Sequence, residues 1–131
     1  MKMSRRILAT ILCLALVLSL AVVAYAASST FVTGTRYGYR YNARGTISGL
    51  TATAKLSATA ISGEVSIPSS DCSGDVWVLV FIDETNVIAS AHNTGTLSTT
   101  ATSTVTQPIY KTYSTFEFTG LDLGGYRLYN S

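Results

Sequence analysis

A nine-residue stretch, Asp75–Asp83, constrains the fold of this chain more than any other segment. It reads Asp-Val-Trp-Val-Leu-Val-Phe-Ile-Asp, so seven consecutive apolar residues lie between two aspartates. The run is mostly β-branched or aromatic and is too short to cross a membrane, which favours a central β-strand. Successive side chains of a strand point to opposite faces, and here both faces are apolar. We therefore expect a sheet built around this strand.

The two faces of the strand need different partners. One face carries the residues Val76, Val78, Val80 and Ile82, and the other carries Trp77, Leu79 and Phe81. A strand of a sandwich usually turns one face to the core and the other to water. We expect Phe31–Tyr41 to fold over Trp77 and cover the second face within the chain. The alternative is an open apolar patch that is used for association or binding.

The N-terminus has the three parts of a secretory signal peptide. Three basic residues precede an apolar run, Ile7–Val23, and Ala24-Tyr25-Ala26 then places small residues at both recognition positions. We expect residues 1–26 to be a signal peptide that is cleaved after Ala26, and the protein to be secreted and extracellular. An uncleaved membrane anchor is the alternative.

Removal of the signal peptide changes the charge balance. The remaining residues, 27–131, contain six Lys and Arg against seven Asp and Glu. No basic stripe is left to hold phosphates, so nucleic-acid binding has no support. With 105 residues the mature chain is long enough for one domain and too short for two. Its polar surface is made mainly by 18 Thr and 14 Ser.

The mature chain reads as a series of short strands. Alternation is plainest in Leu50–Ser62, where Ala and Leu face one way and Thr, Ser and Lys the other. Thirteen extended residues span roughly 43 Å at about 3.3 Å each, so we expect a bend or bulge within this strand. A short strand is expected at Glu64–Ile67. Turns are expected at Asn42–Gly45, Asn93–Gly95 and Gly124-Gly125. The pattern predicts an all-β fold, a single antiparallel β-sandwich of seven or eight strands, with a small barrel as the alternative.

Groups that could carry out catalysis are few. The mature chain has one His, one Cys and seven scattered carboxylates, so we expect neither an enzyme nor a cofactor. His92 is expected at the surface, at a strand end. The segment Ser69–Asp75 has two aspartates but no calcium-loop signature, so no metal site is expected. Within it, Cys72 is expected to be a loop thiol, with an intermolecular disulfide as the alternative.

Aromatic residues are the best candidates for binding. Tyr37, Tyr39 and Tyr41 share one face of an early strand and could form a flat ribbon that stacks on sugar rings or on another protein. The competing interpretation places this face at the rim of the core. Trp77 is the fourth candidate, on the open face of the central strand.

The segment Phe116–Leu128 runs aromatic-x-aromatic, then Gly-Leu, then Gly-x-Tyr. It resembles the closing hairpin of the prealbumin-like repeats of Gram-positive surface adhesins, over thirteen residues. Such repeats often carry a Lys–Asn isopeptide bond assisted by an acidic residue, and the resemblance points to Lys55, Asn130 and Glu117. Because Lys55 belongs to the Thr/Ser face of its strand, we expect no such bond, and we assign no family.

The sequence thus favours a small secreted non-enzymatic β-domain that acts by surface binding or self-association at the bacterial cell exterior. The expected partners are a cell-surface glycan, a protein or a second copy of the chain, with no membrane contact after cleavage. A small exported antimicrobial or toxin-like protein is the alternative.

Overall fold

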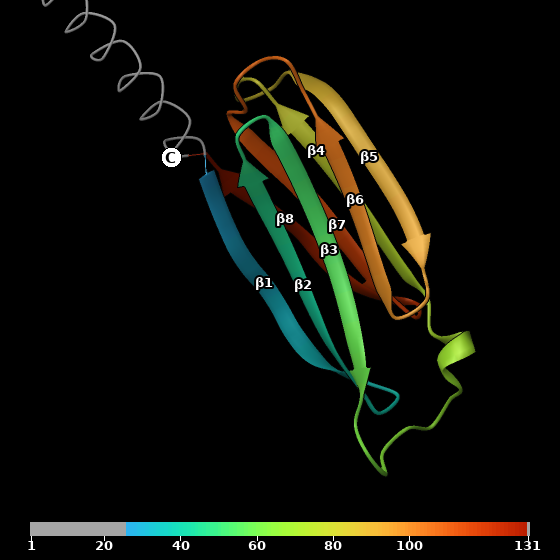
Figure 1. Ribbon diagram of the computed structural model, residues 1–131. Coiled ribbons are helices and arrows are strands. Elements are labelled where there is room, and N and C mark those ends of the chain that lie inside the picture. The colour runs from blue at the N-terminus through green and yellow to red at the C-terminus, as the bar shows by residue number, and fades with distance from the viewer. Residues whose placement is uncertain (1–25, 131) are drawn as a thin grey trace, which may run out of the picture.

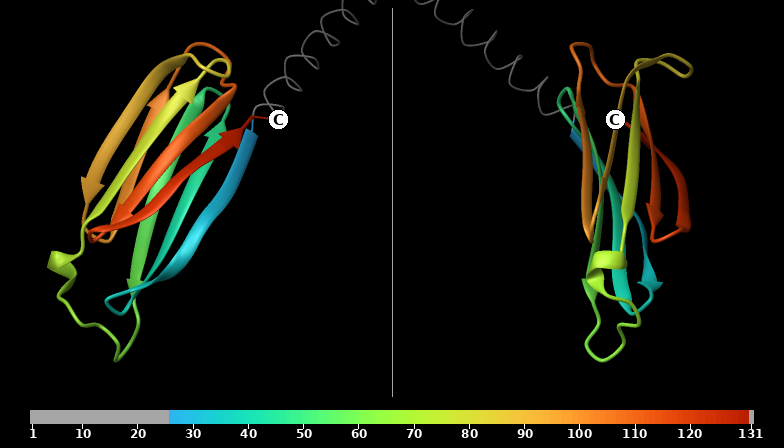
Figure 2. Two further views of the ribbon diagram at one scale, coloured as in Figure 1. Left: turned by 180° about the vertical axis from the view of Figure 1, so that it is seen from behind. Right: turned by 90° about the vertical axis from the view of Figure 1, so that its right-hand side faces the viewer.

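Two antiparallel sheets of four strands face each other in the computed structural model, which describes residues 26–130 (Figure 1). The first sheet has the strand order β1 (Ala26–Arg36), β2 (Tyr39–Ser48), β3 (Thr51–Ala60) and β6 (Ser98–Thr104). The second sheet has the order β5 (Val87–Gly95), β4 (Gly74–Phe81), β7 (Lys111–Phe118) and β8 (Leu121–Tyr129). The predicted eight-stranded sandwich is therefore confirmed, and Figure 2 shows its two layers from the edge.

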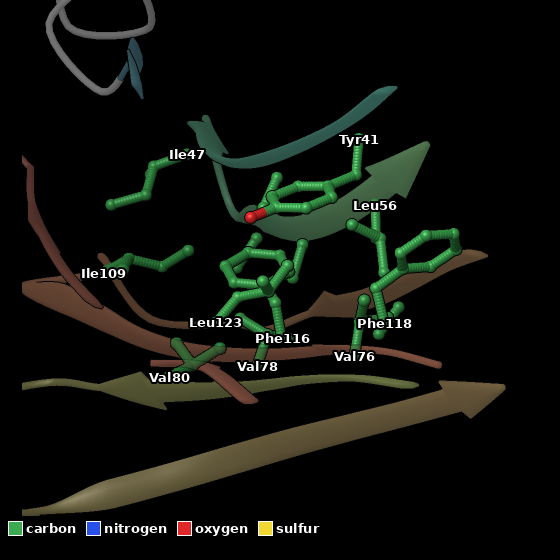
Figure 3. Packing of buried hydrophobic residues seen from close by; sticks show 14 of the residues in the cluster. Tyr41, Ile47, Leu56, Val76, Val78, Val80, Ile109, Phe116, Phe118 and Leu123 are labelled. Carbon is green, nitrogen blue, oxygen red and sulfur yellow. The ribbon is translucent and has the colours of Figure 1, made fainter. Parts of the chain in front are cut away.

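The strand that was expected to be central is β4, which pairs with β5 on one side and with β7 on the other. Its residues Val76, Val78 and Val80 are fully buried between the sheets. Across the core they meet side chains of the facing sheet, such as Leu56 on β3. Phe116 and Phe118 of β7, the neighbouring strand in the same sheet, belong to the same core (Figure 3). Burying each of these side chains stabilises the fold by roughly 1.5–3 kcal/mol. The predicted alternation is confirmed in the middle of β3, where Ala52, Ala54 and Leu56 are buried and Lys55 faces water. At the ends of the predicted segment it is wrong, because Leu50 and Ala60 are exposed.

Several predicted turns are wrong, because their glycines lie inside strands. Asn42–Gly45 lies inside β2, which pairs with both β1 and β3. A Cβ at Gly45 would lie 2.5 Å from the ring of Phe31, so glycine is there to let that ring approach the strand. The chain turns instead at Tyr37-Gly38, where φ is +53° and +82°. Positive φ at both central residues is the geometry of a tight hairpin turn.

The expected turns at Asn93–Gly95 and Gly124-Gly125 also fall inside strands, β5 and β8 respectively. After β5 the chain crosses to the other sheet, so no hairpin forms there. The β7–β8 hairpin turns at Thr119-Gly120, again with positive φ at both residues. Glu64–Ile67 forms no strand, and β3 keeps an uninterrupted register with both neighbours. The expected bulge is absent there because β3 is only ten residues long.

Cys72 is not an exposed loop thiol, which corrects the expectation from the sequence. It is 1% exposed and belongs to the core cluster, with its Sγ 3.8 Å from the carbonyl oxygen of Pro68. The connection from β3 to β4 packs against the core at one end of the sandwich, where the Tyr39 hydroxyl donates to the carbonyl of Ile67 at 2.9 Å. An intermolecular disulfide would require this thiol to leave the core.

The predicted signal peptide, residues 1–26, lies outside the described residues except for Ala26, which opens β1. Its cleavage stays a prediction. Within residues 26–130, no helix is long and apolar enough to span a membrane.

Candidate binding site

The outer face of β4 is open to solvent, so the expected cover by Phe31–Tyr41 is wrong. Trp77 is 43% exposed, and Leu79 and Phe81 beside it are half-buried. Strands β1 and β2 belong to the opposite sheet and cannot reach this face. Figure 2 shows the outer face of the second sheet without another layer over it. The alternative, an open apolar patch, describes the molecule.

The tyrosine ribbon does not form either. Tyr39 and Tyr41 are 2% and 8% exposed and point into the core, so no ligand can stack on them without opening the sandwich. Tyr37 adopts positive φ in the β1–β2 turn, which breaks the period of two and leaves its ring at the surface. There the guanidinium of Arg36 lies 4.6 Å from its centroid. Of the four aromatic candidates, only Tyr37 and Trp77 are exposed, and they lie on different sheets.

Trp77 is held in place by its neighbour on β5. His92 is its cross-strand partner, and the two rings stack with centroids 3.9 Å apart and planes 12° from parallel. The Nε2 atom of His92 lies 2.6 Å from Oδ1 of Asp75, which fixes the imidazole in turn. His92 therefore lies within β5, not at the expected strand end, and it orients an exposed indole. Such pre-organisation lowers the entropy lost when a ligand binds.

A groove of about 300 Å³ opens on the other side of Trp77. It extends over β4, β7 and β8, and no residue of β5 takes part in its lining. The lining residues are Asp75, Trp77, Tyr113, Thr115, Phe116, Glu117, Asp122, Gly124 and Gly125. We call this feature the Trp77 groove.

The floor of the groove depends on a glycine. The phenol of Tyr113 lies across Gly125, and a Cβ at that position would overlap the ring. On β8, the guanidinium of Arg127 lies 6.0 Å from the Tyr113 centroid. Packing geometry therefore requires glycine at position 125, because any side chain there would displace the ring of Tyr113. Thr115, the cross-strand partner of Trp77 on β7, completes the space between the two rings.

Three carboxylates form a row across one end of the groove. Asp75 on β4 pairs with Glu117 on β7, which pairs with Asp122 on β8. The β7–β8 register shifts next to Glu117, and Gly124, with φ of +96°, takes up the extra length. The Gly124 N–H donates to Oδ1 of Asp122 at 2.8 Å. Like charges at directly paired positions destabilise a sheet, so this row costs folding free energy.

The opposite end of the open face is a closed ionic cluster. Lys111 is 6% exposed, and its Nζ lies 2.8 Å from the carbonyl oxygen and 3.2 Å from Oε2 of Glu84. The rings of Phe81 and Tyr129 lie 4.8 and 5.9 Å from the same nitrogen. The Tyr110 hydroxyl donates to Glu84, and this bond, followed by that from Lys111, lowers the pKa of the glutamate. Among the groove carboxylates, Asp75 is paired with His92, and within residues 26–130 Glu117 and Asp122 contact no cation.

The described residues offer little for catalysis. Within 26–130, no group of three or more His, Cys, Asp and Glu side chains is arranged to hold a metal ion. The expectation of a non-enzymatic protein stays a prediction. Lys55, which the adhesin resemblance points to, lies on β3 of the first sheet, whereas Asn130 follows β8 of the second sheet and its amide donates to the carbonyl of Ile109.

Comparison with known proteins gives no match to any protein-family model, curated protein or solved structure. The site must therefore be interpreted from its own geometry. Sequence reasoning found Trp77 but missed His92, Tyr113, Glu117 and Asp122. The period of two along β7 carries part of the signal, because it places Tyr113, Thr115 and Glu117 on the face opposite to the buried Phe116 and Phe118.

Proposed function

We propose that this protein is a small secreted, non-enzymatic β-sandwich domain that binds a cell-surface glycan through the Trp77 groove. The observation that carries this proposal is the exposed indole of Trp77, which His92 holds in one orientation beside the groove. Exposed aromatic side chains usually rotate freely, so a fixed one at a groove is suited to a flat ligand face. Secretion rests on the pattern of residues 1–26.

The chemistry of the groove supports a sugar ligand. The rings of Trp77 and Tyr113 provide apolar surfaces that match the C–H face of a pyranose. The carboxylates of Asp75, Glu117 and Asp122 accept hydrogen bonds from hydroxyl groups, and bonds to charged acceptors are the stronger ones. The groove is concave and combines aromatic rings with a few convergent polar groups, which is how small-ligand sites fix the orientation of a ligand.

A binding screen on the mature domain, residues 27–131, tests the proposal. The variants Trp77→Ala and Tyr113→Ala should lose retention on the polysaccharides or cell walls that the unchanged domain binds. Tyr37→Ala is the matched control, because it removes an exposed aromatic ring from the other sheet. Binding that survives Trp77→Ala and disappears with Tyr37→Ala would refute the assignment of the groove.

Self-association is the second candidate, and the charges of the open face favour it. Carboxylates occupy one end of the face, and the exposed Arg127 lies away from them, so two copies related by a two-fold axis could pair opposite charges. Sedimentation of the unchanged domain and of Trp77→Ala separates the candidates: a dimer that the substitution abolishes would assign the face to self-association. The described residues add nothing to the alternative of an exported antimicrobial or toxin-like protein.

A further inference from the structure

We propose that the Trp77 groove selects a cationic glycan, one whose sugar rings carry free ammonium groups, over its neutral and acylated counterparts. This inference rests on the proposed function, and it names the class of ligand.

The first step of the argument is charge complementarity. Three of the seven Asp and Glu residues of the chain line this one groove, and none of the Lys and Arg residues does. Asp75 is shared with His92, but within residues 26–130 no cation contacts Glu117 or Asp122. The carboxylates would repel an anionic sugar such as a uronic acid, whereas an ammonium group would neutralise part of their negative charge.

The second step is the cost of the row. The three carboxylates stand at paired positions on β4, β7 and β8, and the turn at Thr119-Gly120 sets Asp122 opposite Glu117 before the register shifts at Gly124. Folding alone gains nothing from adjacent like charges, and such local conflicts are expected where a site serves a ligand.

The third step is the aromatic wall. Trp77 offers the groove an indole, which among side chains attracts cations most strongly over its face. Tyr113 adds a second ring on the floor, beside Gly125. The rings take the apolar faces of sugars, and the carboxylates at the end of the groove take an ammonium substituent. The groove therefore offers a partner both to the sugar rings of an amino-sugar chain and to its ammonium groups.

The experiment compares three β-1,4-linked tetrasaccharides that differ only at C2: glucose, N-acetylglucosamine and glucosamine. The chain has a single tryptophan, so the intrinsic fluorescence reports on Trp77 directly. Titrations are run at about pH 5.5, which keeps the glucosamine amine in its ammonium form and lies above the ordinary pKa range of carboxyl side chains. The glucosamine tetramer should bind about tenfold more tightly than the other two, and the preference should decrease as salt is raised.

The variant Glu117→Gln with Asp122→Asn should remove most of this preference while keeping the shape of the groove. Glu64→Gln, an exposed glutamate outside the groove, is the control and should keep the preference. Equal binding of the three tetramers would overturn the inference and leave the proposed function standing. Preference for a neutral or acetylated tetramer would also overturn it. Absence of any Trp77-dependent binding, here and in the polysaccharide screen, would overturn the proposed function as well.

Discussion

Replacing Glu117 by glutamine should stabilise the fold, because it removes the middle charge of the carboxylate row. Glu117 is exposed and pairs across the sheet with Asp75 on one side and Asp122 on the other. A like-charge cross-strand pair costs about 0.2–1 kcal/mol. Asp75 is partly compensated by His92, and the row is open to solvent, so we expect a gain near the low end, about 0.5 kcal/mol.

Urea unfolding at two ionic strengths provides the assay. The Debye length is about 30 Å in 0.01 M salt and about 3 Å in 1 M salt, so repulsion along the row is screened only in the second condition. The gain from Glu117→Gln should therefore be present at low salt and largely absent at high salt. An unchanged m-value would show that the two unfolding transitions can be compared.

Glu64→Gln is again the control, because Glu64 is an exposed residue of the β3–β4 connection, outside the row. Its unfolding free energy should not move. The reasoning would be refuted if Glu117→Gln were destabilising at low salt, or if its effect were the same at both ionic strengths. Either result would mean that the three carboxylates do not repel one another and that the row needs no functional explanation.

Three further substitutions test the packing and the ionic cluster. Cys72→Ser places a hydroxyl in the core and should lower the unfolding free energy by about 1–3 kcal/mol, and the native thiol should react slowly with a thiol reagent. Ser114→Ala should raise stability by about 1 kcal/mol, since its buried Oγ has no hydrogen-bond partner among the described residues; any loss of stability in thermal unfolding would contradict this. Glu84→Gln should flatten the acid side of the stability profile. Tyr110 and Lys111 lower the pKa of Glu84. Its contribution to the free energy of unfolding is therefore present above the ordinary glutamate pKa of about 4.3, and it is lost as the pH falls from there through the lowered pKa. If Glu84→Gln left the acid side of the stability profile unchanged, the cluster would add nothing to stability.

Much of the fold could be predicted from period and composition. The apolar run at Asp75–Asp83 identified an inner strand, and the alternation in Leu50–Ser62 identified which side chains of β3 face the core. These predictions hold because burial of one strand face is the dominant stabilising term. It requires apolar residues at every second position, and that alternation can be recognised in the sequence.

The glycines were harder to interpret, because one residue type answers several needs. Gly45 and Gly125 lie in strands under aromatic rings, whereas Gly38 and Gly120 make turns with positive φ. Local sequence does not distinguish a missing side chain that makes room for a distant ring from one that frees the backbone. The predicted turns failed for this reason.

The candidate site was recognised only in part, since it depends on how strands are paired. Trp77 could be chosen from its own strand, but its partners lie on other strands and come together only through the register of the sheet. The burial of Cys72 likewise follows from the path of a loop that has no periodic pattern. Whether a second apolar face is covered is a property of the whole fold, and no local pattern in Asp75–Asp83 decides it.

Quenching of Trp77 fluorescence by acrylamide tests the central claim most directly, because Trp77 is the single tryptophan of the chain. In the free domain, residues 27–131, the half-exposed indole should be quenched readily, and a glycan selected by the screen should protect it on binding. An indole that resists quenching in the free protein would mean that the face is covered. Unchanged quenching while the glycan is bound would place the binding site elsewhere on the molecule.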